Sequence, residues 1–266
     1  MSNSKKSPFI QQKIAEIKSK LARPCTAFET GGFRPTGERT ESWIGRVFLC
    51  RPDEAKSVTD KHGKPLYALA QFYLPALPYV PESLKHITYL TVFMGEEFPY
   101  VKGEYGIDKT DENGEQYWEM HAELGNNGDG WLIREYTADD ELIEYEFETL
   151  EYPKALPLKA NYIAEDYPMW DGGGIPMDIE DEICDLKDEY DLDYHDDIKT
   201  AHSYQHKFGG YASFCQSGVD FSDDDNAEFV FQISSDEKAE FNVVDSGSLM
   251  FARTPDGKWK LYYDFY

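Results

Sequence analysis

The chain has 266 residues, of which 41% are hydrophobic and 15% aromatic, enough apolar material for a sizeable core. Its 51 acidic and 26 basic side chains give a formal charge of −25, which repels nucleic acid phosphates and anionic lipid surfaces. We therefore expect no nucleic-acid partner and no membrane partner, whereas a basic protein would suit this charge. Length alone is compatible with one large domain or two small ones.

The cysteines are Cys25, Cys50, Cys184 and Cys215, which lie far apart and lack metal-ligand spacing. No apolar segment of the kind found in secretory leaders precedes them. The longest apolar run, residues 87–94, is far shorter than the ~18 residues that a spanning helix needs. Together these features predict reduced cysteines and a cytoplasmic protein.

Two amphipathic helices are predicted. The first starts at Ser7, an N-cap followed by proline, and ends near Pro24. The second follows Pro176, with Asp178 as its N-cap and an apolar face that continues to Ile198. Because the many carboxylates of the second helix lack the spacing of a calcium loop, we expect a solvated acidic face.

Apolar runs and alternating patterns predict strands, separated by turns rich in glycine and proline. Residues 25–42 are rich in Gly, Thr and Arg and are predicted as loop. The predicted strands are residues 43–50 with a bend at Gly45, 65–74, 87–94, 116–121, 131–136, 143–147, 229–233, 248–253 and 259–265.

The two ends of the chain share one order of features. Gly45 precedes an apolar run with a single glutamine, Gln71, and a second apolar run follows; Gly209 precedes Gln232 in the same way. This order indicates a diverged duplication. The predicted fold is therefore α+β and sheet-rich, with pseudo-two-fold duplicated β units, an N-terminal helix and one central acidic helix.

We expect residues 1–266 to form a single domain built from two half-repeats. The halves would span about 25–150 and 177–266, and a seam rich in proline and glycine, residues 151–176, would join them. Trp170 and Asp171 lie in this seam beside three consecutive glycines. They could line a cleft between the halves or simply pack there.

Several strings resemble the YwqG-like family of bacterial proteins. They are the segments beginning at Leu66, His206, Phe229 and Asp245, together with Gln216. The resemblance covers residues 43–266 and implies a duplicated, sheet-rich α+β fold without an established activity. The sequence departs from the family pattern after Gly45, where Arg46 replaces the expected second glycine.

Few residues point to chemistry. The sequence holds no nucleophile elbow, zinc-protease motif, phosphate loop or dinucleotide fingerprint. Gln71 and Gln232 must each find partners inside an apolar strand, either by tying a loop to the sheet or by contacting a ligand. Asp245 is expected to bond its own turn.

The histidines give the best metal-like spacing. His202 and His206 are four residues apart, and His195 and several aspartates lie upstream. Two histidines are too few for a metal site, and Gly209 ends any helix that would place them on one face. We expect no metal and no cofactor, and ordinary hydrogen-bonded histidines.

Three functions remain open. The first is a non-catalytic binding or protein-interaction module, with His206, Gln232, Asp245, Gln71, Trp170 and Asp171 as candidate ligand contacts. The second is an immunity-type protein whose acidic surface neutralises a basic toxin. The third is a hydrolase-like enzyme that uses His206 with Asp245 or Asp171, which requires these side chains to converge in a pocket.

Overall fold

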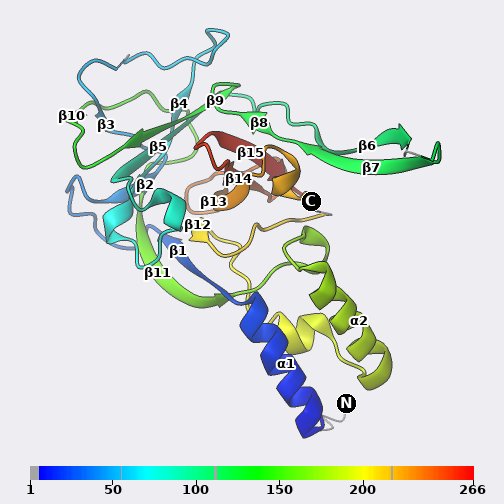
Figure 1. The fold of residues 1–266 in the computed structure, drawn as a ribbon. Helices are drawn as coiled ribbons and strands as arrows, with labels where there is room; N and C mark the ends of the chain where they lie inside the picture. The colour runs from blue at the N-terminus through cyan, green and yellow to red at the C-terminus, as the bar shows by residue number, and fades with distance from the viewer. Residues whose placement is uncertain (1–5, 55, 111–112, 217) are drawn as a thin grey trace.

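The computed structural model describes residues 6–266 except 55, 111–112 and 217, and its fold is sheet-rich α+β (Figure 1). The helices are α1 (Pro8–Leu21) and α2 (Met177–Tyr190), followed by the π-helical turn η4 (Tyr194–Ile198). The 3₁₀ turns are η1 (Leu74–Ala76), η2 (Glu82–Leu84), η3 (Trp170–Gly172) and η5 (Phe221–Asp223). The strands are β1 (Arg23–Thr30), β2 (Ser42–Ile44), β3 (Leu49–Cys50), β4 (Tyr67–Tyr73), β5 (Tyr89–Met94), β6 (Gly103–Thr110), β7 (Gln116–Glu123), β8 (Gly125–Asn126), β9 (Trp131–Tyr136), β10 (Ile143–Glu144), β11 (Leu156–Asp166), β12 (Lys207–Gly209), β13 (Glu228–Ser234), β14 (Ser248–Arg253) and β15 (Trp259–Asp264).

Eleven strands of the described chain form one curled antiparallel sheet, a half-barrel in the order β8-β15-β14-β13-β12-β1-β11-β2-β4-β5-β9. β1 and β11 form the middle pair, with Glu29 opposite Lys159. Outward from this pair, each side continues through a short strand to a seven-residue strand with a buried glutamine, β13 on one side and β4 on the other. The hairpin β6–β7 forms a sheet of its own and projects from the body (Figure 1).

The apolar core fills the inside of the curl. Alternate residues of the strands point inward, as the two-residue period of a strand requires. Aromatic rings from both sides of the middle pair meet there, since the Phe72 ring of β4 lies 5.0 Å from that of Phe208 in β12, and Phe231 stacks on Phe208 at 4.8 Å. This packing joins both sides of the sheet in one core.

Two glycine bends give the short strands their shape. Gly45, at φ +70, follows β2, and Gly209, at φ +78, ends β12. An added Cβ would lie 2.7 Å from the carbonyl oxygen of Lys154 at Gly45, and 3.0 Å from that of Pro24 at Gly209. Both bends therefore need a residue without a side chain. The predicted bend at Gly45 is confirmed.

The two α-helices lie side by side below the sheet (Figure 1). Ser7 caps α1 by accepting the N–H of Ile10 at 3.3 Å, so the predicted start of this helix is confirmed. The basic side of α1 faces the acidic side of α2, and Lys13 donates to Glu182 at 2.7 Å. The acidic face of α2 is thus partly paired as well as solvated. No helix of the described chain is long and apolar enough to cross a membrane.

Two central strands were not predicted. Residues 25–42 were expected as loop, but β1 occupies residues 23–30; the expected seam, residues 151–176, contains β11. Proline and glycine mark the ends of these segments, while β1 and β11 are stabilised by pairing with each other across long sequence separations.

The second helix is shorter than predicted. Asp191, at φ +55, ends α2, and residues 194–198 form η4. The helix begins at Met177 with Pro176 as its N-cap residue and no side-chain cap, so the predicted cap at Asp178 is wrong. The apolar period continues to Ile198 because η4 packs into the same cluster as α1 and α2.

Candidate functional site

A buried polar network surrounds Gln232, which is 1% exposed. Its Oε1 accepts the N–H of Ser213 at 3.0 Å, and its Nε2 donates to the carbonyl of Gln205 at 3.0 Å. Gln232 therefore ties a loop to the sheet, the first of the two roles considered for it. The buried polar network consists of the side chains of Asp166, His202, Lys207, Ser213, Gln232, Ser234 and Ser248.

Lys207 and Asp166 form a fully buried ion pair, with Nζ 3.0 Å from Oδ2. Asp166 also accepts the N–H groups of Ser203 at 2.7 Å and Tyr211 at 2.9 Å. A Cβ at Gly210 would lie 2.3 Å from the same carboxylate, so only glycine allows this approach. Burial lowers the pKa of Lys207, and Asp166 opposes that effect. The pair thus fixes the segment after β12 against β11.

His202 orients Ser213. Its Nδ1 lies 2.7 Å from the carbonyl oxygen of Tyr167, which can only accept, so Nδ1 carries the proton. Burial first, and then the charge of Lys207, lower the pKa of His202 to about 4. The ring is therefore neutral near neutral pH, and its Nε2 lies 2.8 Å from the Ser213 hydroxyl, whose one proton is shared between this nitrogen and the carbonyl of Ser203 at 3.1 Å.

A hydroxyl that donates to an imidazole is the geometry of a nucleophile and its general base. General bases work best when their pKa lies near the working pH. The pKa of His202, about 4, therefore favours an orienting role for this histidine over an activating one.

His206 belongs to the same region and is 2% exposed. Its Nδ1 accepts the N–H of Ser234 at 3.0 Å, and its Nε2 lies 3.3 Å from the carboxylate of Asp236. The hydroxyl of Ser234 is 2.9 Å from the amide nitrogen of Gln232. The structure thus brings together two of the predicted site residues, His206 and Gln232.

The aspartates expected beside His206 lie elsewhere. Asp245 is exposed, and its carbonyl accepts the N–H of Tyr266 at 3.0 Å. Asp171 is exposed in η3, next to the half-buried Trp170. The carboxylate that contacts His206 belongs to Asp236, a residue outside the predicted set.

The turn at residues 242–247 also differs from expectation. The side chain that holds it is that of Asn242, whose Oδ1 accepts the N–H of Ser246 at 2.9 Å and whose Nδ2 donates to the carbonyl of Val244 at 2.8 Å. The prediction that Asp245 bonds this turn is wrong. An asparagine two or more residues earlier can reach the same backbone groups.

Gln71 is fully buried between Trp43 of β2 and Thr91 of β5. Its Oε1 accepts the N–H of Phe48 at 3.0 Å and that of Leu49 at 3.1 Å. This glutamine also ties a loop to the sheet. Its Nε2 has no hydrogen-bond partner among the described residues, whereas every polar atom of the Gln232 amide is bonded.

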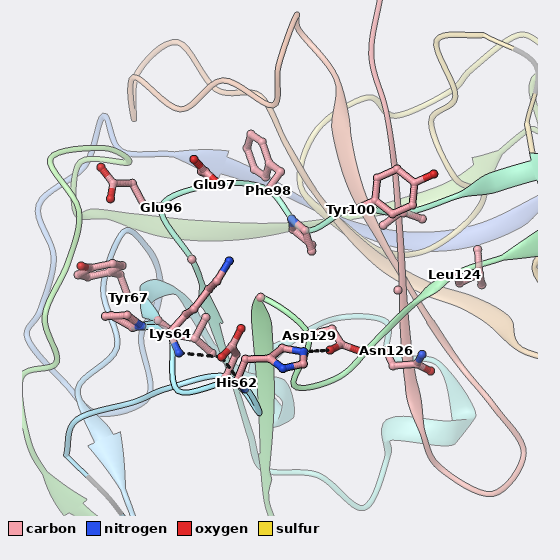
Figure 2. Close-up of a pocket in the computed structure, with 18 of the residues that line it drawn as sticks. His62, Lys64, Tyr67, Glu96, Glu97, Phe98, Tyr100, Leu124, Asn126 and Asp129 are labelled. Atoms are coloured by element: carbon pink, nitrogen blue, oxygen red, sulfur yellow. Dashed lines mark hydrogen bonds and ion pairs between the residues drawn. The ribbon is translucent and has the colours of Figure 1, made fainter.

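A cavity of about 740 Å³ lies beside β8, and neither glutamine lines it (Figure 2). Figure 2 shows Glu96, Glu97, Phe98 and Tyr100 along one side, and the contact between His62 and Asp129 on the other. We call it the acidic cavity, because carboxylates outnumber the cationic groups in its lining. The carboxylates are those of Asp60, Glu96, Glu97, Glu123 and Asp129, and the lining also includes His62, Lys64, Tyr67, Phe98, Tyr100 and Lys102.

Local turns build the acidic cavity. Asp60 closes one turn by accepting the N–H groups of His62 at 2.9 Å and Lys64 at 2.8 Å. Burial would raise the pKa of Asp60, but these N–H groups bring it below its ordinary value. On the other side, the chain leaves β5 at Gly95, whose N–H donates to the carbonyl of Gly130 at 2.8 Å.

This cavity could not be predicted from the sequence, because its walls come from distant segments. One signal was available, the adjacent Glu96 and Glu97 directly after a predicted buried strand and its glycine. Tyr100 is 87% exposed, which no pattern in the sequence indicates.

The histidines do not assemble a metal site. In the part of the chain that the structure describes, no three His, Cys, Asp or Glu side chains are grouped as ligands of one ion. His195 is exposed in η4 beside the ring of Tyr194, and His202 and His206 have the separate partners described above.

Residues 50–257 match the family model described as Domain of unknown function (DUF1963). The match covers well over half of the chain and includes strands from both sides of the middle pair, while β1, β2 and β15 lie outside it. No curated protein matches the sequence.

Proposed function

The chain belongs to the DUF1963 family, and we propose that it is a non-catalytic binding module that holds a cationic segment of a partner protein in the acidic cavity. The observation that carries this proposal is the free acidic wall of the cavity. Glu96 and Glu97 are both exposed, and neither makes an ion pair with a described residue. An arriving lysine or arginine would therefore find carboxylates without a competing partner.

The remaining carboxylates of the cavity are already engaged. Asp129 lies 2.6 Å from Lys61, and Glu123 lies 3.3 Å from Lys102. These carboxylates already have cationic partners, so binding would rest on Glu96 and Glu97. Exposed ion pairs contribute little individually, and a cationic segment would need further contacts.

Aromatic side chains supply such contacts. Tyr100 is 87% exposed on the same wall as the two glutamates, and Phe98 packs 5.8 Å from the ring of Tyr263. The face of an aromatic ring attracts an ammonium or guanidinium group. Acidic and aromatic groups on one wall therefore suit a lysine- or arginine-rich segment.

The charge of the whole chain supports the same partner. A formal charge of −25 attracts cations over a distance and raises the rate at which they arrive. The attraction is screened by salt, so we expect binding to weaken as ionic strength rises.

The test is a titration of the protein with an arginine-rich peptide, followed by calorimetry. Neutralising the wall with Glu96→Gln and Glu97→Gln should weaken binding by about tenfold or more, which corresponds to ~1.4 kcal/mol. Tyr100→Ala should weaken it further, since the peptide loses an aromatic contact.

A matched control removes the same charge from a distant surface. Glu180→Gln with Asp181→Asn changes two adjacent exposed carboxylates on α2, far from the cavity. The control should leave the affinity nearly unchanged. Equal losses in both double variants would show that only the overall charge attracts the peptide, and the proposed site would be wrong.

The immunity-type function is a more specific form of this proposal, favoured by the same acidic wall. In that case the cationic segment belongs to a basic toxin, and the protein should abolish the toxin's activity in a purified assay. A toxin encoded next to this gene is the first partner to test; a complex that leaves the toxin active would contradict this form.

We also propose that the sheet consists of two diverged copies, related by an approximate two-fold axis through the β1–β11 pair. The order of strands on the two sides supports this, as does the glycine bend that precedes each glutamine strand. A register irregularity also occurs at corresponding points, between Ala68 and Ala70 in β4 and between Phe229 and Phe231 in β13.

The narrower YwqG-like assignment and a cytoplasmic location belong to the same proposal. The strings that begin at His206 and Asp245 support the first. The cysteines, all of them free, support the second, since a reducing compartment keeps them so.

A further inference from the structure

A second cavity, of about 580 Å³, adjoins the buried polar network. Ser213, Ser234 and Ser248 line it, and we call it the serine cavity. These side chains come from the loop after β12, from β13 and from β14, and each residue is at most 4% exposed. Three separate segments thus bring buried hydroxyls to one wall.

The network orients these hydroxyls. The Ser213 hydroxyl lies 2.8 Å from His202 and 3.1 Å from the carbonyl of Ser203, and it accepts from the amide of Gln232 at 2.9 Å. The Ser234 and Ser248 hydroxyls lie 2.9 Å apart on paired strands. A hydroxyl has one donor and two acceptor sites, so this pair keeps hydrogen-bonding capacity beyond the bond that joins it.

The corresponding place on the other side of the sheet is filled. Ser234 lies two residues after Gln232 and opposite Ser248; Tyr73 lies two residues after Gln71 and opposite Tyr89. The rings of Tyr73 and Tyr89 pack at 5.0 Å. Serines in place of this ring pair leave space at the same point of the framework.

The charges around the serine cavity exclude one class of ligand. Among the described residues that line it, none is Lys, Arg or His, whereas Asp236, Glu237 and Glu240 are present. A phosphate or carboxylate would meet like charges without a cation to pair with. The ligand must therefore be neutral or cationic.

Two tyrosines line the cavity, and the serine hydroxyls beside them decide between these classes. Tyr204 is 50% exposed and Tyr266 is 68% exposed, and both belong to its lining. Aromatic faces beside hydroxyl and carboxylate groups match the two kinds of surface on a sugar ring, its apolar face and its rim of hydroxyls. A polyamine, in contrast, would leave the donor capacity of the serines unused.

We propose that the serine cavity binds a neutral polyhydroxylated ring, a sugar, through the hydroxyls of Ser234 and Ser248 and the ring faces of Tyr204 and Tyr266. This site is separate from the acidic cavity and needs no partner protein. The orienting network of Gln232 and His202 holds the serines in place before the ligand arrives.

The experiment titrates the protein with glucose, galactose, ribose and maltose in saturation-transfer NMR, with glucose 6-phosphate and spermidine as charged comparisons. We expect at least one neutral sugar to bind, and glucose 6-phosphate to bind more weakly than glucose. Ser248→Ala should weaken sugar binding about tenfold, the effect of one buried hydrogen bond.

Filling and control variants complete the test. Ser234→Tyr with Ser248→Tyr restores the ring pair of the other side and should abolish binding; if it does not fold, Ser248→Ala still decides. Ser57→Ala removes an exposed serine elsewhere and should change nothing. Absence of binding by every neutral sugar, tighter binding of the phosphate or spermidine, or an unchanged affinity in Ser248→Ala would each overturn the proposal.

Discussion

The side-chain oxygens of Gln71 and Gln232 hold corresponding loops in the two halves of the sheet, one on each side of the β1–β11 pair. The Gln71 oxygen accepts the N–H groups of Phe48 and Leu49, and that of Gln232 accepts the N–H of Ser213. In each case the accepting strand pairs with the short strand that leads into the loop. A buried amide thus replaces the backbone partner that an irregular segment would otherwise lack.

Replacing either glutamine should destabilise the fold, and Gln232 should matter more. Gln71→Leu leaves two buried N–H groups unpaired, for a loss of about 1–3 kcal/mol in the free energy of unfolding. Gln232→Leu additionally frees the Gln205 carbonyl and disrupts the serine hydroxyls. Urea unfolding of both variants measures the difference; a smaller loss for Gln232→Leu would contradict this ranking.

Removing one partner of the buried ion pair should lower the free energy of unfolding more than removing both charges. Lys207→Met leaves the Asp166 carboxylate buried without its cation, which typically costs about 3–5 kcal/mol. Adding Asp166→Asn removes the remaining charge, so the double variant should recover part of the loss. Urea unfolding checks this, and a double variant as unstable as the sum of the single variants would argue against coupling.

His202 should make stability depend on pH. Its pKa is about 4 in the folded protein and 6.5 for the free side chain, so the unfolded chain binds the proton more readily. The contribution of neutral His202 to the free energy of unfolding is fully present above pH 6.5, and it is lost as the pH falls toward 4. His202→Gln should flatten that part of the curve of unfolding free energy against pH, relative to the parent protein. Parallel curves would contradict this assignment.

The glycine bends should tolerate no side chain. Gly45→Ala places a Cβ 2.5 Å from the carbonyl oxygen of Pro153, whereas Gly63→Ala, at a similar φ of +81, meets nothing within 4 Å. The free energy of unfolding of Gly63→Ala should therefore fall only by the roughly 1–2 kcal/mol that the left-handed conformation costs a residue with a Cβ. Gly45→Ala should lose clearly more. Thermal unfolding compares the two, and equal shifts in Tm would refute the steric argument.

The strands with continuous apolar runs could be predicted from the sequence, and the two middle strands could not. The apolar runs around Gln71 and Gln232 match β4 and β13 closely. β1 and β11 have mixed composition and proline at or near their ends, and they are stabilised by pairing with each other. Local patterns carry no information about such distant partners.

For the candidate sites too, some features could be predicted from the sequence and others could not. Single buried glutamines in apolar strands pointed to the network around Gln232, because a buried amide must be bonded. The partner of His206 could not be found, since Asp236 is distant in sequence and has no distinctive surroundings. The acidic cavity depends on turns that bring residues 60–67 and 95–102 together, which only the fold reveals.

The pairing of β1 with β11 also determines whether the chain could be cut into two fragments that fold separately. β1, from the N-terminal part, pairs with β11 and β12 of the C-terminal part, while β11 pairs with β1 and β2; β8 in turn lies along β15. A cut between β10 and β11 would leave each fragment with central strands whose edges are open. Neither fragment could pair all the strands of its own half, and the two fragments would have to reassociate to complete the sheet. A one-copy ancestor of the proposed duplication would, by the same logic, have exchanged its leading strand with a second chain and existed as an intertwined dimer.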